Sequence, residues 1–328
     1  MRLAPSAEQR RFADTLDALL TAADVPAVAQ SWADGDFGPG RAVWTRLAEA
    51  GVAGLVVPDR WGGLDGSPAD LVVACEVLGR HALPGPVAET VAAVPALLAG
   101  LGEDGPAGKW LPELAGGRVL ATLAAPPLLP YAVDAHAAEL VLLASPGALR
   151  PGRPGAIRPS LDPTRHPAEV IAGEPVATGP QVASALAGAL DLGALAAAAH
   201  LLGAGHALLD ATVAYARTRV QFGRPIGSFQ AVQHRLADVA VALEFARPLL
   251  YAAAAGEGGT AARDVSAAVV ACGDAAHLAA RAALQVHGAI GYTREYGLGR
   301  WLNRVRALRA GWGTPAYHRG RVLAEVTR

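Results

Sequence analysis

Cysteine and lysine are scarce in this sequence, and each scarcity excludes a class of site or partner. The two cysteines, Cys75 and Cys272, lie far apart in apolar surroundings, which favours buried free thiols over a disulfide or a metal site. Lys109 is the one lysine among 28 basic residues, so nearly every cation is an arginine, whose planar fork suits phosphate. The formal net charge of −1 and the pI near 6.8 give no attraction to nucleic acid or to an anionic membrane.

Targeting and membrane-spanning segments are also missing from the pattern. Residues 1–9 contain no basic-then-apolar run, so we expect no signal peptide. Apolar stretches are diluted by alanine or interrupted, and we expect none to offer the roughly 20 residues of high hydropathy that a bilayer span requires. The sequence therefore predicts a cytoplasmic protein with no membrane partner.

Apolar residues are abundant, and they are arranged in three regions of different texture. Hydrophobic residues make up 52% of the 328 residues and charged residues 17%, which suits an ordered protein with a sizeable core. Residues 1–117 have helical periodicity after a capping serine, Ser6, whereas residues 118–182 alternate short apolar runs with proline and glycine. We predict a mainly α protein with an N-terminal helical domain (1–117), a reduced β-domain of about four to six short strands (118–182) and a C-terminal helical domain (183–328).

The C-terminal region predicts a four-helix bundle. Its helices are expected over residues 183–217, 232–250, 261–286 and 315–326. The second of them carries one apolar stripe at steps of three, four or seven residues. Thr314 followed by Pro315 is a typical N-cap and first-turn pair, which opens the last helix.

Two motifs in this region resemble the signature of the acyl-CoA dehydrogenase family. Residues 215–227 read YARTRVQFGRPIG and are soon followed by FQAVQH, and residues 285–296 read QVHGAIGYTREY. Residues 51–58 (GVAGLVVP) and 61–63 (WGG) are similar to the first domain of that family. The resemblance implies a helical N-domain, a β-domain and a C-terminal four-helix bundle, assembled as a dimer of dimers that binds FAD.

The resemblance also implies which residues bind FAD. A guanidinium offers a pyrophosphate two donors in one plane, which suits Arg219, and Phe222 gives the adenine end an aromatic wall. In the family, the positions of Arg219, Phe222, Gln230, Gln285 and Gly288 hold the adenylate-pyrophosphate half of a FAD seated mainly in the neighbouring subunit. Ala289 stands where a second glycine is usual, and its methyl group narrows the approach of the backbone to the cofactor. The alternative is that Arg219 stabilises a helix end and Phe222 fills core, but both motifs at family spacing favour the FAD clamp.

The carboxylate that the family's chemistry requires is missing. Members remove an α-proton from an acyl thioester while hydride leaves the β-carbon, so a base must lie within hydrogen-bond reach of the α-carbon. Trp312 occupies the position of the family's catalytic glutamate, and an indole cannot accept that proton. The alternative base position falls near Gly193, where the nearest acid, Asp191, points about 200° away on a helix. Residues 123–127 (LAAPP) stand at the flavin-ring loop and carry no polar group to address the ring.

Three hypotheses follow. The leading one is a non-catalytic subunit that clamps FAD for a full-length acyl-CoA dehydrogenase partner in an α2β2 heterotetramer, by resemblance to steroid side-chain β-oxidation enzymes. The partner would then carry the catalytic glutamate and bind most of the acyl-CoA substrate. The second is a self-sufficient flavoenzyme that uses an unusual base such as Asp191, and the third is a flavin-free scaffold protein that kept only the fold.

Overall fold

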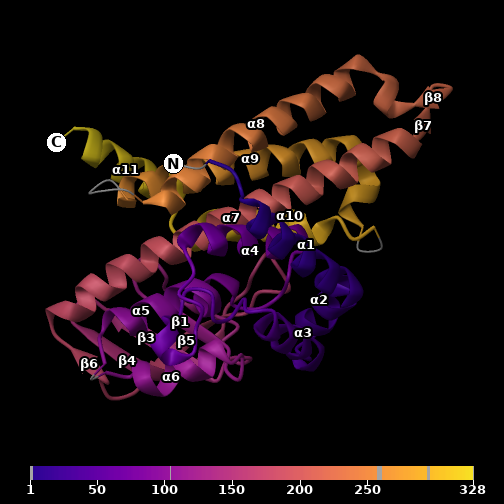
Figure 1. Cartoon of the computed structure of the whole chain (residues 1–328). Coiled ribbons are helices and arrows are strands. Elements are labelled where there is room, and N and C mark those ends of the chain that lie inside the picture. Colours follow the sequence, from indigo (N-terminus) through magenta and orange to yellow (C-terminus); the bar gives the residue numbers. More distant parts are fainter. Residues whose placement is uncertain (1–2, 104, 257–260, 294–295, 328) are drawn as a thin grey trace.

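The long helix α7 (Pro180–Thr218) runs through the whole molecule and separates its two halves. The computed structural model describes residues 3–103, 105–256, 261–293 and 296–327. In Figure 1 the N-terminal helices and a small sheet lie along one side of α7, and the C-terminal helices lie along the other. The predicted fold class, mainly α with a small sheet and a C-terminal bundle, is confirmed.

The N-terminal part is helical, as predicted. Ser6 caps its first helix reciprocally, because the Ser6 hydroxyl accepts from the Gln9 amide at 3.1 Å and the Gln9 side chain accepts from the Ser6 amide at 2.8 Å. The elements in order are α1 (Ala7–Ala22), α2 (Val25–Ala33), α3 (Gly38–Glu49), the 3₁₀ turn η1 (Asp59–Trp61), α4 (Pro68–Arg80), the π-helical turn η2 (Glu89–Ala93), α5 (Val94–Gly100) and α6 (Ala107–Ala115).

The middle of the chain forms one six-stranded sheet. Its strands are β1 (Ala121–Ala124), β2 (Ala132–Val133), β3 (Leu140–Ser145), β4 (Ala148–Ile157), β5 (Pro167–Ala172) and β6 (Ala177–Thr178). The order is β1-β3-β4-β5-β2, with β6 paired to β4, and only the β1–β3 pair is parallel. Strand β1 is buried and is fixed to η2, since the Thr90 hydroxyl donates to the Ala121 carbonyl at 2.8 Å.

The C-terminal part contains the four predicted helices and one that was not predicted. After α7 come the hairpin β7 (Val220–Gln221) and β8 (Arg224–Pro225), η3 (Ile226–Ser228), α8 (Gln230–Ala255), α9 (Ala261–His287), η4 (Gly288–Tyr292), α10 (Gly299–Gly311) and α11 (Pro315–Val326). Thr314 caps α11 as expected, accepting from the Tyr317 amide at 3.2 Å. Helix α10 escaped the sequence pattern because it is rich in arginine and buries only Arg304, Val305 and Leu308.

Glycine allows α7 to lie unusually close to α4. A β-carbon placed on Gly203 of α7 would lie 1.9 Å from the Glu76 carbonyl oxygen, and one on Gly79 of α4 would lie 2.1 Å from the His200 carbonyl oxygen. Neither backbone could move away without breaking the packing, so both helices need glycine at the crossing. This contact sets how the N-terminal half sits on the bundle.

The expectation that no segment has the length and hydropathy of a membrane span was wrong. Two helical segments, residues 180–218 and 261–292, contain windows of mean hydropathy 1.7 and 1.3. Of these windows, 61% and 56% are buried inside the fold. A core helix passes the same test of length and composition. The many alanines of these two helices raise their mean hydropathy, whereas we expected alanine to lower it.

A buried arginine joins the separate parts of the fold. The Arg304 guanidinium is 1% exposed and donates to the Asp162 carboxylate at 2.6 Å, to the Leu83 carbonyl at 2.7 Å and to the Thr164 hydroxyl at 2.7 Å. His200 of α7 lies 3.2 Å away, and burial together with Arg304 holds its pKa well below the ordinary value, so the ring is a neutral acceptor. One side chain of α10 therefore ties the N-terminal part, the sheet and α7 together.

We expect this pair to make stability depend on pH. Burial raises the pKa of Asp162, but the charge and hydrogen bond of Arg304 outweigh it and hold the pKa below the ordinary 3.8. Its stabilisation is therefore complete above 3.8 and is lost as the pH falls through the depressed value. Asp162→Asn should cost about 3–5 kcal/mol at neutral pH, because it leaves Arg304 buried without its counter-charge, and the cost should shrink in acid.

Urea unfolding of both proteins between neutral pH and the acid limit of folding measures this. Asp274→Asn is the control, because its bridges to Arg309 and Arg319 are partly exposed and should contribute less than about 1 kcal/mol. A cost of Asp162→Asn that stays constant into acid would contradict an ionised Asp162.

Candidate functional site

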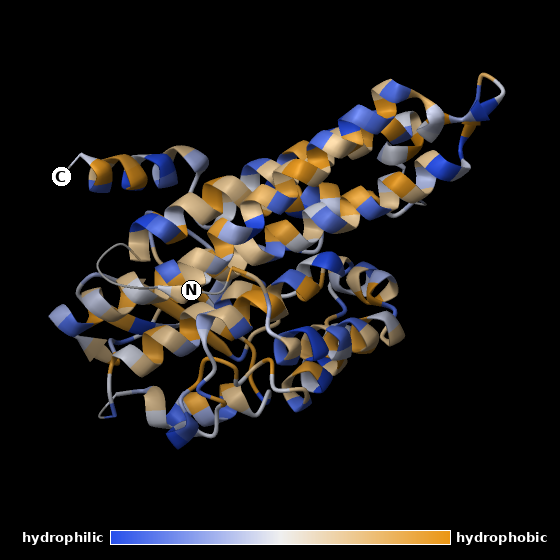
Figure 2. Ribbon diagram, turned by 45° about the horizontal axis from the view of Figure 1, so that its top comes forward, coloured by the Kyte–Doolittle hydropathy of each residue, from blue (hydrophilic) through white to orange (hydrophobic). Residues whose placement is uncertain are grey.

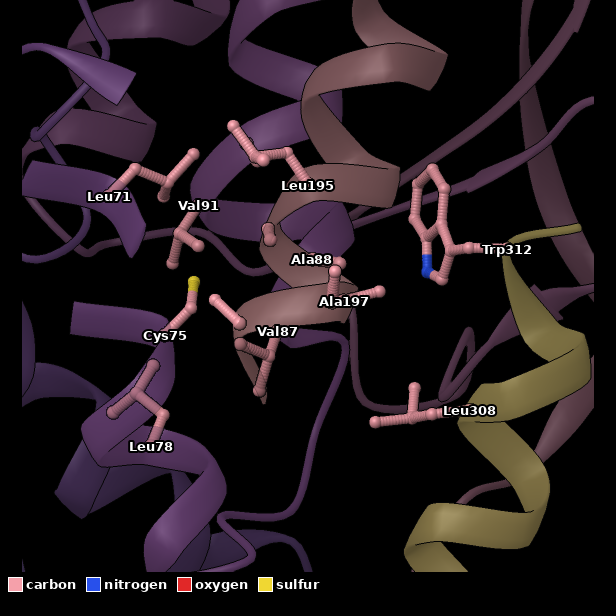
Figure 3. Packing of buried hydrophobic residues seen from close by; sticks show 14 of the residues in the cluster. Leu71, Cys75, Leu78, Val87, Ala88, Val91, Leu195, Ala197, Leu308 and Trp312 are labelled. Atoms are coloured by element: carbon pink, nitrogen blue, oxygen red, sulfur yellow. The ribbon is translucent and has the colours of Figure 1, made fainter. Parts of the chain in front are cut away.

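Trp312, which follows α10, is buried in the main hydrophobic core with 1% of its surface exposed. Figure 3 shows its indole directed toward the segment of α7 that carries Leu195 and Ala197. A β-carbon placed on Gly193 of α7 would lie 2.3 Å from Cζ3 and 2.4 Å from Cη2 of Trp312. The indole therefore fills the space that a side chain at position 193 would need.

The backbone of Trp312 is held as firmly as its ring. His318 of α11 lies with Nε2 2.8 Å from the Trp312 carbonyl oxygen, and a carbonyl only accepts, so Nε2 carries the proton. The other ring nitrogen faces the Ser266 hydroxyl at 3.2 Å, and burial lowers the pKa of His318. Gly313 has a φ of +97°, and a β-carbon there would lie 2.6 Å from His318 Nε2. These contacts fix the backbone on which the indole stands.

Asp191, the one acid near this point on α7, is already engaged. Its two carboxylate oxygens accept from the Arg321 guanidinium at 2.7 and 3.2 Å. Both oxygens are therefore occupied by the guanidinium and are not directed at a substrate carbon. The structure thus places Trp312 and Gly193 against each other and leaves Asp191 in a separate ion pair.

The interior beside Trp312 offers little room. A cavity of about 10 Å³ lies between α7 and α10, with Arg165, His200 and Leu308 among its lining residues. That volume holds about one water molecule and no acyl chain. Glu89 is also buried nearby, and its burial raises its pKa while the charge of Arg165 opposes this. No carboxylate of the described residues opens onto a cavity of acyl size here.

The segment expected at the flavin ring has little to offer a cofactor. Leu123 and Ala124 belong to the buried strand β1, and the Ala125 and Leu129 amides bond to each other's carbonyls at 2.7 and 3.0 Å. Pro126 and Pro127, joined by a cis peptide bond, have no N–H to donate. Residues 123–127 therefore present no polar side chain, and Ala125, Pro126 and Pro127 offer no free backbone donor.

The predicted FAD-clamp residues gather at the opposite end of the bundle. Arg219 ends α7 and is exposed, with no hydrogen bond or ion pair to its guanidinium among the described residues. Phe222 and Gly223 form the two-residue turn of the β7–β8 hairpin, with φ of +53° and +77°, which is the pattern of a type I′ turn. Positive φ is unusual for a bulky residue. Phe222 is 92% exposed, and Figures 1 and 2 show the hairpin standing clear of the rest of the molecule.

The remaining clamp residues surround this hairpin. Phe222 and Gln285 line one open recess of about 340 Å³, whose other walls include Phe229, Val232 and Arg235. Gln230, Gly288 and Ala289 are exposed at the ends of α8 and α9 and do not line that recess.

These surroundings fit the adenylate-pyrophosphate end of a dinucleotide. Gly288 has a φ of +64°, and a β-carbon placed on it would meet nothing within 4 Å, so the backbone there is open to approach. Arg294 and Glu295 of the second motif lie outside the described residues. An unpaired guanidinium, an exposed aromatic ring and an open recess at one end of the bundle suit a ligand that arrives from outside this chain.

The contacts of Trp312 with Gly193 and His318 were not predicted from the sequence. Gly193 and Trp312 were singled out separately, but no pattern indicates that they touch, because they lie far apart in the chain, one within α7 and the other just after α10. His318 gave no signal either. Its position three residues after the predicted first helical residue, Pro315, would have placed it in the first turn of α11, facing back toward the cap.

Comparison with known proteins defines the class to which this fold and site belong. Residues 6–118 match the acyl-CoA dehydrogenase N-terminal domain, and residues 183–327 match the acyl-CoA dehydrogenase C-terminal domain. The chain belongs to the acyl-CoA dehydrogenase family, whose members use FAD, so the predicted family and cofactor are confirmed.

Among curated proteins, the chain is similar to acyl-CoA dehydrogenase IpdE2 of Mycobacterium tuberculosis, with 34% identity over 308 residues that cover 92% of each chain. It is 32% identical to IpdE2 of Mycolicibacterium smegmatis over 327 residues, covering 98% of this chain and 99% of the relative.

Solved structures share the fold over nearly the whole chain. The ChsE4–ChsE5 complex from Mycobacterium tuberculosis has a TM-score of 0.87 at 22% identity, covering 100% of this chain and 99% of that one. A variant of the Tcur3481–Tcur3483 steroid ACAD has a TM-score of 0.83 at 23% identity, covering 98% of each. A glutaryl-CoA dehydrogenase from Mycobacterium smegmatis in complex with FADH2 has a TM-score of 0.83 at 18% identity, covering 98% and 95%.

Proposed function

We propose that this chain is a non-catalytic subunit of an FAD-dependent acyl-CoA dehydrogenase. It would clamp the adenylate-pyrophosphate part of FAD for a full-length partner that carries the catalytic glutamate. The complex would remove hydrogen from the α and β carbons of an acyl-CoA thioester, in an α2β2 heterotetramer.

The contact between Trp312 and Gly193 carries this proposal. Both positions at which the family resemblance places a base are occupied by one packed pair, an indole against a glycine. No proton acceptor stands at either position, and the adjacent cavity of about 10 Å³ excludes an acyl chain. Substrate would therefore bind mainly at the partner's site.

The end of the bundle that carries the β7–β8 hairpin supports the proposed FAD clamp. FAD supplies the acceptor for hydride when it is bound, and this chain's residues would hold only its far end. Arg219 would donate to the pyrophosphate in a planar, charge-assisted pair, and Phe222 would cover the adenine from the tip of the hairpin. Phe222 has a positive φ, is 92% exposed and contacts the Phe229 ring edge-on at 6.2 Å between centroids, so most of its surface is free for an external contact.

One structural neighbour, the Tcur3481–Tcur3483 steroid ACAD, supports the substrate class. Another, the complex of ChsE4 with ChsE5, supports a heteromeric assembly. We infer a steroid side-chain thioester for the complex that contains this chain.

Two alternative functions fit the site less well. A self-sufficient flavoenzyme would need Asp191 as its base, and Asp191 is held by Arg321. A flavin-free scaffold would have no use for Phe222, since a bulky apolar residue at positive φ is costly to keep on a free surface.

Co-purification with a partner tests the proposal. The chain would be expressed alone and together with each full-length acyl-CoA dehydrogenase of the same organism, and flavin absorbance and dehydrogenation would be recorded. We expect flavin and activity only in a mixed complex, because the ring pocket and base are on the partner.

Activity from the lone chain would refute the non-catalytic role. If the partner alone binds flavin and dehydrogenates the substrate as well as the mixed complex does, the clamp is refuted. The lone partner is therefore purified and assayed beside the other two samples.

A further inference from the structure

A second recess is separate from the proposed FAD clamp and from the small cavity near Trp312. It has a volume of about 600 Å³, within the usual range for small-molecule sites. Its walls come from three separate parts of the fold: α2, the loop of residues 160–164 between β4 and β5, and the first turns of α10. Small-molecule sites are common at junctions of this kind.

Arg300 of α10 lies between this recess and a neighbouring one, which Asp17, Asp210 and Trp301 line. Its guanidinium stacks on the Trp301 ring at 3.9 Å from the centroid, which holds the planar group in place. Among the described residues it has no ion pair, and its buried Nε has no hydrogen-bond partner. Burial lowers the pKa of Arg300, with Asp24 the one charge that opposes this.

Most partly buried arginines of the described chain behave differently. Arg80, Arg247, Arg309 and Arg321 each pair with a carboxylate at 2.6 to 2.8 Å. Desolvating a guanidinium without a partner is costly, so an unpaired one in a recess indicates a missing anion.

The other walls complete a mixed site. Asn303, one turn after Arg300, has no hydrogen bond to its side-chain amide among the described residues and faces the same recess. Asp34, which follows α2, carries the opposite charge, and its carboxylate accepts from Gln30 at 2.9 Å. Leu161 gives the rim an apolar surface, at 68% exposure.

We propose that this recess binds a small organic carboxylate that has an apolar body and a hydroxyl group at its far end. The carboxylate would pair with the Arg300 fork and accept from Asn303, and the hydroxyl would donate to Asp34 across the recess. The apolar body would lie against Leu161. This binding site is separate from the proposed FAD clamp, and its existence does not depend on that function.

Three related probes test the proposal by calorimetric titration of the full chain. The compound p-hydroxyphenylacetate has both polar ends, phenylacetate lacks the hydroxyl, and tyrosol lacks the carboxylate. We expect p-hydroxyphenylacetate to bind most tightly and tyrosol most weakly. Arg300→Gln should weaken p-hydroxyphenylacetate at least about tenfold, since charge-assisted hydrogen bonds are lost. Asp34→Asn should weaken it toward the affinity of phenylacetate.

Arg306→Gln on the same helix is the matched control, because Arg306 is exposed and does not line the recess. It should leave binding unchanged, and thermal unfolding checks that every variant is folded. Absence of saturable p-hydroxyphenylacetate binding to the unmodified chain would overturn the proposal. Unchanged p-hydroxyphenylacetate binding by Arg300→Gln would also overturn it. If that variant keeps ligand binding but loses a protein partner, the recess is a subunit contact and the proposal is overturned.

Discussion

Arg219→Ala is expected to strip FAD from the mixed complex. The guanidinium is exposed and unpaired among the described residues, so in the proposed complex its hydrogen bonds would go to the pyrophosphate. Losing charge-assisted bonds to a phosphate costs about 3 kcal/mol, which is roughly a hundredfold in the Kd for FAD. Flavin fluorescence during titration of the apo complex measures the affinity directly.

Arg217→Ala is the control for this experiment. Arg217 lies two residues earlier on α7 and is also exposed, so its removal changes the net charge equally. We expect Arg217→Ala to leave the Kd within about threefold, because exposed charges far from a ligand are screened by salt. Equal losses from both variants would mean that Arg219 acts through general charge, and full retention of FAD in Arg219→Ala would contradict the clamp.

Trp312→Ala is expected to destabilise the lone chain by about 3–5 kcal/mol, because it empties a core position filled by an indole. Gly193→Ala should also destabilise it, by about 1–3 kcal/mol, because its β-carbon would lie 2.3 Å from the indole. In the Trp312→Ala background the same Gly193→Ala change should cost much less, since the indole clash is gone and only a 3.1 Å contact with the Ala93 β-carbon remains, against which alanine suits a helix better by about 0.5–1 kcal/mol. Urea unfolding of the four proteins measures this coupling.

Gly188→Ala provides the reference within the same helix. Gly188 is exposed and a β-carbon there meets nothing within 4 Å, so the change should stabilise the chain equally in both backgrounds. Additive costs for Gly193→Ala and Trp312→Ala would contradict the direct contact.

Restoring a carboxylate is not expected to restore the enzyme. Trp312→Glu would place an acid in a site closed by His318, Gly193 and the core, where burial opposes its charged form. The flavin-ring segment at residues 123–127 would still lack a polar side chain, and its Ala125, Pro126 and Pro127 would still offer no free donor. Dehydrogenation by the lone Trp312→Glu chain would show that the acyl and flavin sites are intact after all.

Much of the fold could be predicted because its signals are local. The Ser6 and Thr314 caps and the helical periodicity of residues 183–217 depend on neighbours within one or two turns. Helix α10 was not predicted because it lacks such a local signal. Its buried face is built around Arg304, a charged residue that no apolar periodicity includes. The alanine-rich helices were misjudged for hydropathy, because burial by neighbouring helices is not a property of either segment alone.

The sequence by itself determined the family, the cofactor and the absence of a carboxylate at position 312, because motifs and residue identities need no neighbours to be recognised. Only the tertiary structure decided what replaces the missing base. It put the Trp312 indole against Gly193, engaged Asp191 with Arg321 and left Phe222 exposed at the far end of the bundle. Each of these joins or separates residues on different helices, and such distances follow from packing rather than from spacing along the chain.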